Sequence, residues 1–585
     1  MCTTLEYRAV LMYRVLVPAM VLAAATSTGC TSDDGDGFGT SAGTLKVAET
    51  PEAASTSEVV QSFRSGPSTH GSLVTVATGT VRGLAESSYR MFLGIPYAAA
   101  PVGELRWKPP MPAPSWTGVR AATAAGNVCP QVSYEPAGVP TVIGDEDCLV
   151  LNVTTPNRPN MKKLPVMVWI HGGNYVSGSN IEQDALLLAQ KGDVIVVSIN
   201  YRLGALGFLA HPALSAESPD SSGNFGLLDQ QAALAWVQAN IAQFGGDPTH
   251  VTIFGVSAGG NSVWAHVLSP KSAGLFQRAI SISGLWASCW NWMGYDEPAQ
   301  PLEHSDAEGT GMRFAEAMGC SGSDATAAAC LRAASVSDLV NVGGGAMGPP
   351  FYTWGPTTGG SVLPRPLKEA LAAGEFNRVP IVNGSTHDEG MPFVMMPFWV
   401  YMDNPLTPEV YAGVLAQRFG DDASLVQAHY SVEAYGSATY AYSAVDTDLQ
   451  NACYTRAITR LAARYAPVYA YEFRDPNPPD PFYEYVFGGP LPYAPRAYHG
   501  SDGQYIFRSP SNETGLSPEQ LDLSDHMIEY YTTFARFGAP RGYPHWRPYS
   551  PSRDAVQSLA PDAIGPVTNF ARDHQCGFWA ELRGI

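Results

Sequence analysis

Short apolar runs alternate with stretches of helical periodicity along most of this chain. Residues 166–170 and 194–199 are apolar and rich in β-branched side chains, which is typical of parallel strands buried on both faces. Residues 227–243 have helical periodicity and end in a glycine-containing turn. Further strands are expected at 251–254, 279–282, 379–382 and 468–471. The alternation predicts an α/β fold whose large, mostly parallel central sheet has helices on both faces.

The start of the folded part has a different pattern. Residues 73–76 and 80–83 predict an antiparallel hairpin, and hence an N-terminal antiparallel extension of the sheet. Charged residues make up only 15% and hydrophobic residues 45% of the 585, which supports a large packed core. The net charge of 34 − 53 = −19 argues against nucleic acid as a partner, since binding the phosphate backbone needs a basic face.

The first 29 residues are expected to be a signal peptide. Arg14 precedes an apolar run that is too short to span a bilayer comfortably, and Met12 is an alternative start. Cys30 ends a sequence similar to a bacterial lipobox, which predicts a lipid anchor and membrane attachment there. Ser27 stands where that motif usually has Leu, so ordinary cleavage near Ala25 is the alternative. Both alternatives predict export, to the periplasm or cell surface or as a secreted protein, and export permits disulfides.

Residues 30–72 are rich in Ser, Thr, Gly and acidic residues, which predicts a flexible tether. An acidic cluster at 33–37 lacks the spacing and the closing Glu of a calcium-binding loop. Residues 73–585 show no second linker of this kind, and we interpret them as one catalytic domain. No close Cys/His spacing indicates a zinc site, and neither a metal site nor a cofactor is expected.

Ser257 lies in the motif Gly255-Val256-Ser257-Ala258-Gly259, between a predicted strand and a predicted helix. This is the context of a nucleophile elbow, a sharp turn that projects the serine hydroxyl above the sheet. A glycine-rich loop, His171-Gly172-Gly173-Asn174, follows an earlier strand. Such a loop can aim backbone N–H groups at a developing alkoxide. The predicted oxyanion-hole donors are the amides of Gly173, Asn174 and Ala258.

These motifs belong to a longer series in which the chain, from about residue 73 to its C-terminus, resembles the type-B carboxylesterases. This is the cholinesterase-like branch of the α/β-hydrolases. The matching segments are Phe92–Ala98, Pro101–Trp107, Glu146–Val153, Asn200–Gly204, Phe244–Gly259 and Phe534–Gly538, followed by Trp546. The chain departs from the family at Asn174, where a third glycine or an alanine is usual, and at Val150, where an aromatic residue is usual.

A serine nucleophile needs a histidine base and a carboxylate that fixes the histidine tautomer. Eight histidines follow Ser257, so chain order alone does not select one. The resemblance implies His499 as the base and Glu389 as the acid, with Asp388 as the rival acid. It also implies that Ser283 supports the acid. The chemistry expected is hydrolysis of carboxylic esters through an acyl-enzyme on Ser257.

Nine cysteines are present, and two of them belong to the N-terminal segment. The resemblance implies the pairs Cys129–Cys148, Cys320–Cys330 and Cys453–Cys576. Cys289 is left over as an expected free thiol. The resemblance also implies a structural ion pair between Arg106 and Glu146.

The expected substrate is a small ester with an apolar acyl or alcohol group. The apolar segment 391–399 and three tryptophans, Trp286, Trp290 and Trp292, are either walls of its pocket or plain core. Choline recognition is not supported, because Tyr134 is the only aromatic residue between Cys129 and Cys148. The alternatives are a lipase, a polyester or toxin esterase, an amidase, or a non-catalytic binding protein on the same fold. The sequence does not indicate an oligomeric state.

Overall fold

The computed structural model describes nine ranges of the chain. They are 72–134, 140–157, 163–217, 222–284, 302–344, 354–395, 406–479, 493–508 and 515–584. The predicted signal peptide, most of the tether and Cys30 lie outside these ranges, as does Cys289. Within them, no helix combines the length and apolar character needed to cross a membrane.

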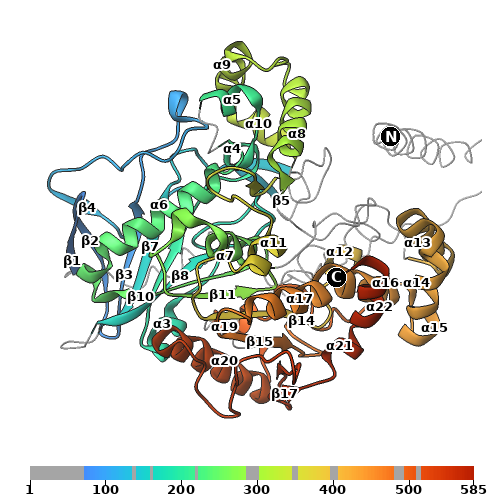
Figure 1. Ribbon diagram of the computed structural model, residues 1–585. Helices are drawn as coiled ribbons and strands as arrows, with labels where there is room; N and C mark the ends of the chain where they lie inside the picture. Colours follow the sequence, from blue (N-terminus) through green and yellow to red (C-terminus); the bar gives the residue numbers. More distant parts are fainter. Residues whose placement is uncertain are drawn as a thin grey trace, which may run out of the picture. The chain divides into compact units, whose positions relative to one another are not determined.

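A 13-stranded sheet forms the centre of the described residues (Figure 1). Its strands are β1 (Ser72–Val76), β2 (Gly79–Ala85), β3 (Tyr89–Pro96), β4 (Val119–Ala121), β7 (Val150–Pro156), β8 (Leu164–Ile170), β9 (Ile195–Ile199), β10 (Gly246–Val256), β11 (Arg278–Ile282), β14 (Ile381–Thr386), β15 (Val468–Phe473), β16 (Val556–Leu559) and β17 (Gly565–Val567). Two small sheets pair β5 (Gln131–Tyr134) with β6 (Pro140–Ile143) and β12 (Leu302–Glu303) with β13 (Thr357–Thr358).

The order across the large sheet is β1-β2-β3-β7-β9-β8-β10-β11-β14-β15-β16-β17, with β4 beside β2. Every neighbouring pair from β9 to β16 is parallel. The pairs from β1 to β9 along this path are antiparallel, as is β16 with β17. The predicted mostly parallel sheet with an antiparallel N-terminal extension is therefore confirmed.

The alternating side chains of β8 show that both faces of the sheet are covered. Val166, Val168 and Ile170 belong to one buried apolar cluster, and Met167 and Trp169 belong to another. The first cluster includes residues of α6 (Phe225–Asn240) and α7 (Ala258–Leu268), and the second includes residues of α3 (Leu186–Gly192) and α20 (Pro518–Phe537). A strand buried on both faces has apolar residues at every position, which explains the continuous run seen in the sequence.

A third apolar cluster holds together helices that follow β14 in the sequence. Tyr430, Tyr442 and Trp579 are buried in it, and the indole Nε1 of Trp579 donates a 2.6 Å hydrogen bond to the Tyr430 hydroxyl. These helices are α13 (Pro408–Phe419), α14 (Ala423–His429), α15 (Val432–Tyr435), α16 (Ala438–Asp446) and α22 (Cys576–Arg583). The other α-helices are α4 (Gly204–Phe208), α5 (Pro212–Glu217), α8 (His304–Ala317), α9 (Ala325–Ala333), α10 (Val336–Gly343), α11 (Leu367–Ala373), α12 (Met391–Met395), α17 (Cys453–Ala462), α19 (Gly503–Ile506) and α21 (Phe570–Asp573).

Several predicted boundaries are wrong. Strand β14 begins at Ile381, two residues late, because Pro380 has no N–H for the ladder. The predicted strand ends at 382, but β14 continues through residues 383–386 because they pair with residues 470–473 of β15. The helix predicted over 227–243 runs from Phe225 to Asn240 and then tightens into a 3₁₀ turn over Ile241–Phe244.

The structure contains the three expected disulfides: Cys129–Cys148, Cys320–Cys330 and Cys453–Cys576. The expected ion pair is also present. Arg106 binds Glu146 with both ends of its guanidinium, Nε to Oε1 at 2.7 Å and Nη2 to Oε2 at 2.6 Å. Both side chains are largely buried, so this two-point contact satisfies charges that would otherwise be costly to desolvate.

A buried histidine makes the stability of the fold sensitive to acid. His266 contacts Gln230 Oε1 through Nε2 at 2.9 Å and Ser272 Oγ through Nδ1 at 3.0 Å, and burial lowers its pKa to about 3. In the unfolded chain, His266 has an ordinary histidine pKa and binds a proton at about pH 6, whereas in the folded state it stays neutral at that pH. The free energy of unfolding should therefore fall as pH drops below about 6.5, by about 2 kcal/mol between pH 7 and pH 5 from this residue.

Urea unfolding at both pH values measures this loss. In His266→Gln, which keeps a polar side chain in place, the difference between pH 7 and pH 5 should shrink by that amount. An unchanged difference would show that His266 is not the group responsible.

Candidate active site

Five neighbouring strands of the parallel sheet deliver the predicted site residues to one edge. The glycine-rich loop follows β8, Ser257 follows β10, Ser283 follows β11, and Glu389 comes shortly after β14. His499 comes after β15, and its loop pairs with the acid loop through a bridge between Asp388 and Tyr498. Because carboxyl ends of adjacent parallel strands meet at one edge, residues far apart in sequence converge there.

Ser257 occupies a sharp turn between β10 and α7. Its φ of 57° and ψ of −124° are rarely adopted by residues other than glycine. The flanking glycines permit the turn: a Cβ on Gly259 would lie 2.0 Å from Ile170 O, and one on Gly255 would lie 2.6 Å from the same oxygen. Ser257 N donates to Ile282 O at 2.9 Å, which ties the turn to β11. Helix α7 begins at Ala258, so its N-terminus lies directly after the serine.

The glycine-rich loop lies directly against the serine. A Cβ on Gly172 would lie 3.2 Å from Ser257 Cβ and 2.9 Å from the backbone oxygen of Val256, and the second distance is too short for a residue other than glycine. Gly173 and Asn174 both have positive φ, 92° and 54°. Among the described residues, the N–H groups of Gly173, Asn174 and Ala258 donate to no protein acceptor. They are therefore available to bind an oxygen atom of a ligand.

His171 anchors this loop from below. Its ring stacks on Tyr201 with centroids 4.3 Å apart, and the Tyr201 hydroxyl donates to the His171 carbonyl at 2.9 Å. Burial lowers the pKa of His171 to about 4, so the ring is neutral at ordinary pH. His171 therefore holds the glycine-rich loop in position and does not act as a base.

The structure joins the predicted acid and base. Glu389 is fully buried, and its Oε2 lies 2.5 Å from His499 Nδ1. Its other oxygen, Oε1, accepts a 2.8 Å hydrogen bond from Thr386 N, so the carboxylate is held at both ends. A Cβ at position 500 would lie 4.0 Å from Val256 Cγ2, which places the histidine loop against the elbow that carries Ser257.

The rival acid, Asp388, faces another way. Its Oδ2 contacts His387 Nδ1 at 3.0 Å, and its Oδ1 lies 3.6 Å from Arg496 Nη1. Ser283 was expected to support the acid, but its hydroxyl is buried without a hydrogen-bond partner in the described part of the chain. Its backbone has a positive φ of 48° and donates to Gly384 O at 2.9 Å. The supporting role of Ser283 stays a prediction, and the hydrogen bond that the structure gives to Glu389 Oε1 comes from Thr386 N.

Asp502 is a buried carboxyl close to the acid and the base that the sequence analysis did not single out. The Tyr471 hydroxyl donates to its Oδ2 at 2.8 Å. Burial, and after it the charge of Glu389, raises the pKa of Asp502 to about 7, while His499 acts in the opposite direction. The only signal in the sequence was its position three residues after His499. The neighbours of this carboxyl, Tyr471 and Glu389, are distant in the sequence, so no local pattern marks it.

The apolar segment after the acid is divided between the site and the core. Phe393 is partly buried, and its ring centroid lies 5.2 Å from that of His499. Met391 and Met395 are buried against Tyr498, and Val394 belongs to the third apolar cluster. Of the other predicted wall residues, those at 396–399 and the three tryptophans, Trp286, Trp290 and Trp292, lie outside the described residues.

Together, the fold and the strained serine define an α/β-hydrolase with a nucleophile elbow. The chain belongs to the carboxylesterase family, which matches residues 70–579. The predicted fold class and the predicted family are thus confirmed, and the family shows the protein to be a serine hydrolase of carboxylic esters.

Individual relatives agree with this assignment. The chain is 35% identical to fumonisin B1 esterase of Sphingopyxis macrogoltabida over 79% of this chain and 81% of that protein. It is 33% identical to human cocaine esterase, covering 85% and 87% of the two chains. Among solved structures, a thermophilic PNB esterase matches with a TM-score of 0.70 and 31% identity, over 87% of this chain and 100% of the other.

Proposed function

We propose that Ser257, His499 and Glu389 form the catalytic triad of this esterase. The Glu389–His499 contact of 2.5 Å, held against the elbow of Ser257, is the observation that carries the proposal. Ser257 Oγ attacks the ester carbonyl carbon while His499 Nε2 takes its proton. The buried Glu389 fixes the proton of His499 on Nδ1 and stabilises the imidazolium.

The negative oxygen formed in this attack needs donors that are in place beforehand. The N–H groups of Gly173, Asn174 and Ala258 supply them, because none is used within the described protein and the loop abuts Ser257. The alcohol then leaves with the proton from His499, and an acyl group remains on Ser257. Water activated by the same histidine releases the acid and restores the serine.

We further propose a small ester with an apolar acyl or alcohol group as the substrate. Phe393 supports this choice, because it places an apolar ring beside His499, where the leaving group departs. Fumonisin B1 esterase and cocaine esterase are named for different substrates. Membership of the family therefore indicates which bond is cleaved, whereas the shape of the pocket decides which ester binds. The lipase, polyester, toxin-esterase and amidase alternatives share this machinery and differ in which substrates the pocket admits.

We propose that the protein is exported and anchored through Cys30. The three disulfides are compatible with an oxidising compartment, and the apolar run followed by Thr28-Gly29-Cys30 supplies the expected signal. Mass spectrometry of the N-terminal peptide from the producing cell tests the anchor through the mass of a lipidated Cys30.

Hydrolysis of p-nitrophenyl esters tests the proposed function. The protein should hydrolyse p-nitrophenyl butyrate and react once with a fluorophosphonate, which mimics the tetrahedral intermediate, on the peptide carrying Ser257. A series of acyl chain lengths then separates an esterase from a lipase. Labelling at another serine, or turnover without labelling, would contradict the assignment.

A further inference from the structure

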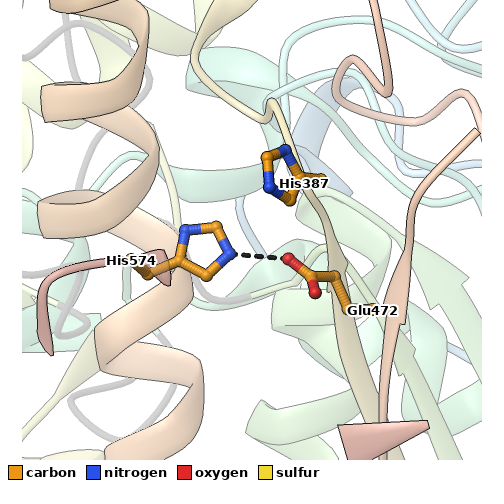
Figure 2. A group of neighbouring side chains, drawn as sticks. All are labelled: His387, Glu472 and His574. Atoms are coloured by element: carbon orange, nitrogen blue, oxygen red, sulfur yellow. Dashed lines mark hydrogen bonds and ion pairs between the residues drawn. The ribbon is translucent and has the colours of Figure 1, made fainter. Parts of the chain in front are cut away.

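Behind the acid loop lies a second group of polar side chains, formed by His387, Glu472 and His574 (Figure 2). His387 directly follows β14, Glu472 is in β15, and His574 follows α21. Each residue offers one nitrogen or oxygen atom, and these three atoms all lie within 4.8 Å of one another. The proposed reaction uses none of them.

Each imidazole in this group is oriented by its own carboxylate. His387 Nδ1 lies 3.0 Å from Asp388 Oδ2, and His574 Nδ1 lies 2.6 Å from Asp448 Oδ1. Figure 2 shows the other nitrogen of His387 on the side of Glu472 and His574. Histidines that bind metals are typically fixed in this way, with Nδ1–H donated to a carboxylate and Nε2 directed at the ion.

The centre of the group already holds a positive charge. His574 Nε2 lies 2.6 Å from Glu472 Oε1, so with both nitrogens bound to carboxylates the ring carries two protons. Glu472 and His574 are almost inaccessible, whereas the side chain of His387 is 35% exposed. The group therefore has a buried carboxylate, Glu472, and one ligand side chain, His387, that solvent can reach.

We propose that His387, Glu472 and His574 bind a divalent transition-metal ion such as Zn²⁺. Two imidazole nitrogens with one carboxylate oxygen suit zinc and its neighbours, whereas calcium and magnesium prefer oxygen ligands alone. The ion displaces the proton between His574 and Glu472, and this proton passes to solvent. With metal–ligand bonds of about 2.0–2.2 Å, two ligand atoms of one tetrahedral ion lie about 3.3–3.6 Å apart. His574 Nε2 and Glu472 Oε1, now 2.6 Å apart, therefore move apart when the proton between them leaves. His387, held through Nδ1 by Asp388, keeps its other nitrogen directed at the ion.

This site lies beyond the proposed ester chemistry, although it is close to it. His387 is two residues before Glu389, and His387 N donates to Phe473 O, beside Glu472. A bound ion would tie the acid loop to β15 and to the C-terminal segment that carries His574. Its role is thus to hold this edge of the sheet, with no part in the attack on the ester.

Metal binding to the untagged, chelator-treated full chain tests the proposal. Co²⁺ serves as the probe because its visible absorption reports its ligands. One equivalent should bind, and Zn²⁺ should displace it. His387→Ala should weaken binding more than about 10-fold, and Asp388→Asn by about 10- to 100-fold. His250→Ala is the matched control, since His250 is a partly exposed histidine whose Nδ1 lies 3.2 Å from Asp247 Oδ2.

Ser257→Ala should bind Co²⁺ as the unmodified protein does. The metal-site proposal and the triad proposal can therefore be contradicted independently of each other. Absence of a saturable Co²⁺ spectrum would overturn the proposal, as would equal affinity in His387→Ala. Either result would make His574 a buried imidazolium that simply links Asp448 to Glu472.

Discussion

Replacing Ser257 with alanine is expected to lower kcat for p-nitrophenyl butyrate by about 10⁶-fold, as removal of the nucleophile does in another serine hydrolase. The cause is the loss of the serine hydroxyl oxygen, which is the proposed nucleophile and which the strained turn at residue 257 holds in place. Alanine at 257 keeps the backbone N–H groups in place. Weak residual hydrolysis from the oxyanion donors should therefore remain measurable above the uncatalysed rate.

Ser262→Ala is the matched control for this change. Ser262 lies in α7, the helix that begins directly after Ser257. It is buried and accepts a 3.1 Å hydrogen bond from Gln230 Nε2. Its loss perturbs α7 without touching the nucleophile, so fluorophosphonate labelling should persist and kcat should stay within about 10-fold. Retained labelling in Ser257→Ala, or equal losses in both variants, would exclude Ser257 as the nucleophile.

Glu389→Gln is expected to lower kcat by about 10⁴-fold, the size seen when the acid of a serine triad becomes an amide. The local geometry gives the reason. Thr386 N needs an acceptor at Oε1, so the new NH₂ group must face His499 Nδ1. A donor in that place forces the ring proton onto Nε2, and the histidine can no longer accept a proton from Ser257.

Steady-state kinetics of Glu389→Gln should show this loss in kcat with a KM changed far less, because the pocket is untouched. Asp388→Asn separates the two acids: its fall in kcat should be at least about 100-fold smaller, since Asp388 faces His387 and Arg496. A larger loss in Asp388→Asn than in Glu389→Gln would reverse the assignment of the acid.

The elements near the nucleophile were predictable because their signals are local. Residues 166–170 are apolar at every position, and β8 is buried on both faces as that pattern predicts. Gly255 and Gly259 flank Ser257, and both prove to be positions where a Cβ would collide with Ile170. In each case, the residue type is fixed by sterics within a few residues or across one neighbouring strand.

Interactions between distant segments could not be found in this way. The choice of Glu389 over Asp388 came from the resemblance to the type-B carboxylesterases, because no local pattern of residues encodes which of the two carboxylates faces His499. The strand character of residues 383–386 comes from pairing with β15, which lies far along the chain. The group around His574 brings together residues 102 and 126 positions apart, so no ligand spacing exists to be recognised.

The order of the strands has a consequence for the newly made chain. Strand β15 precedes the loop of His499 and is bordered on its outer side by β16, which begins only at Val556. A chain that lacks β16 therefore contains all three residues of the proposed triad but presents an open sheet edge, a template for aggregation. Folding without aggregation is consequently expected to depend on residues 556–567, which form β16 and β17 and include no member of the proposed triad.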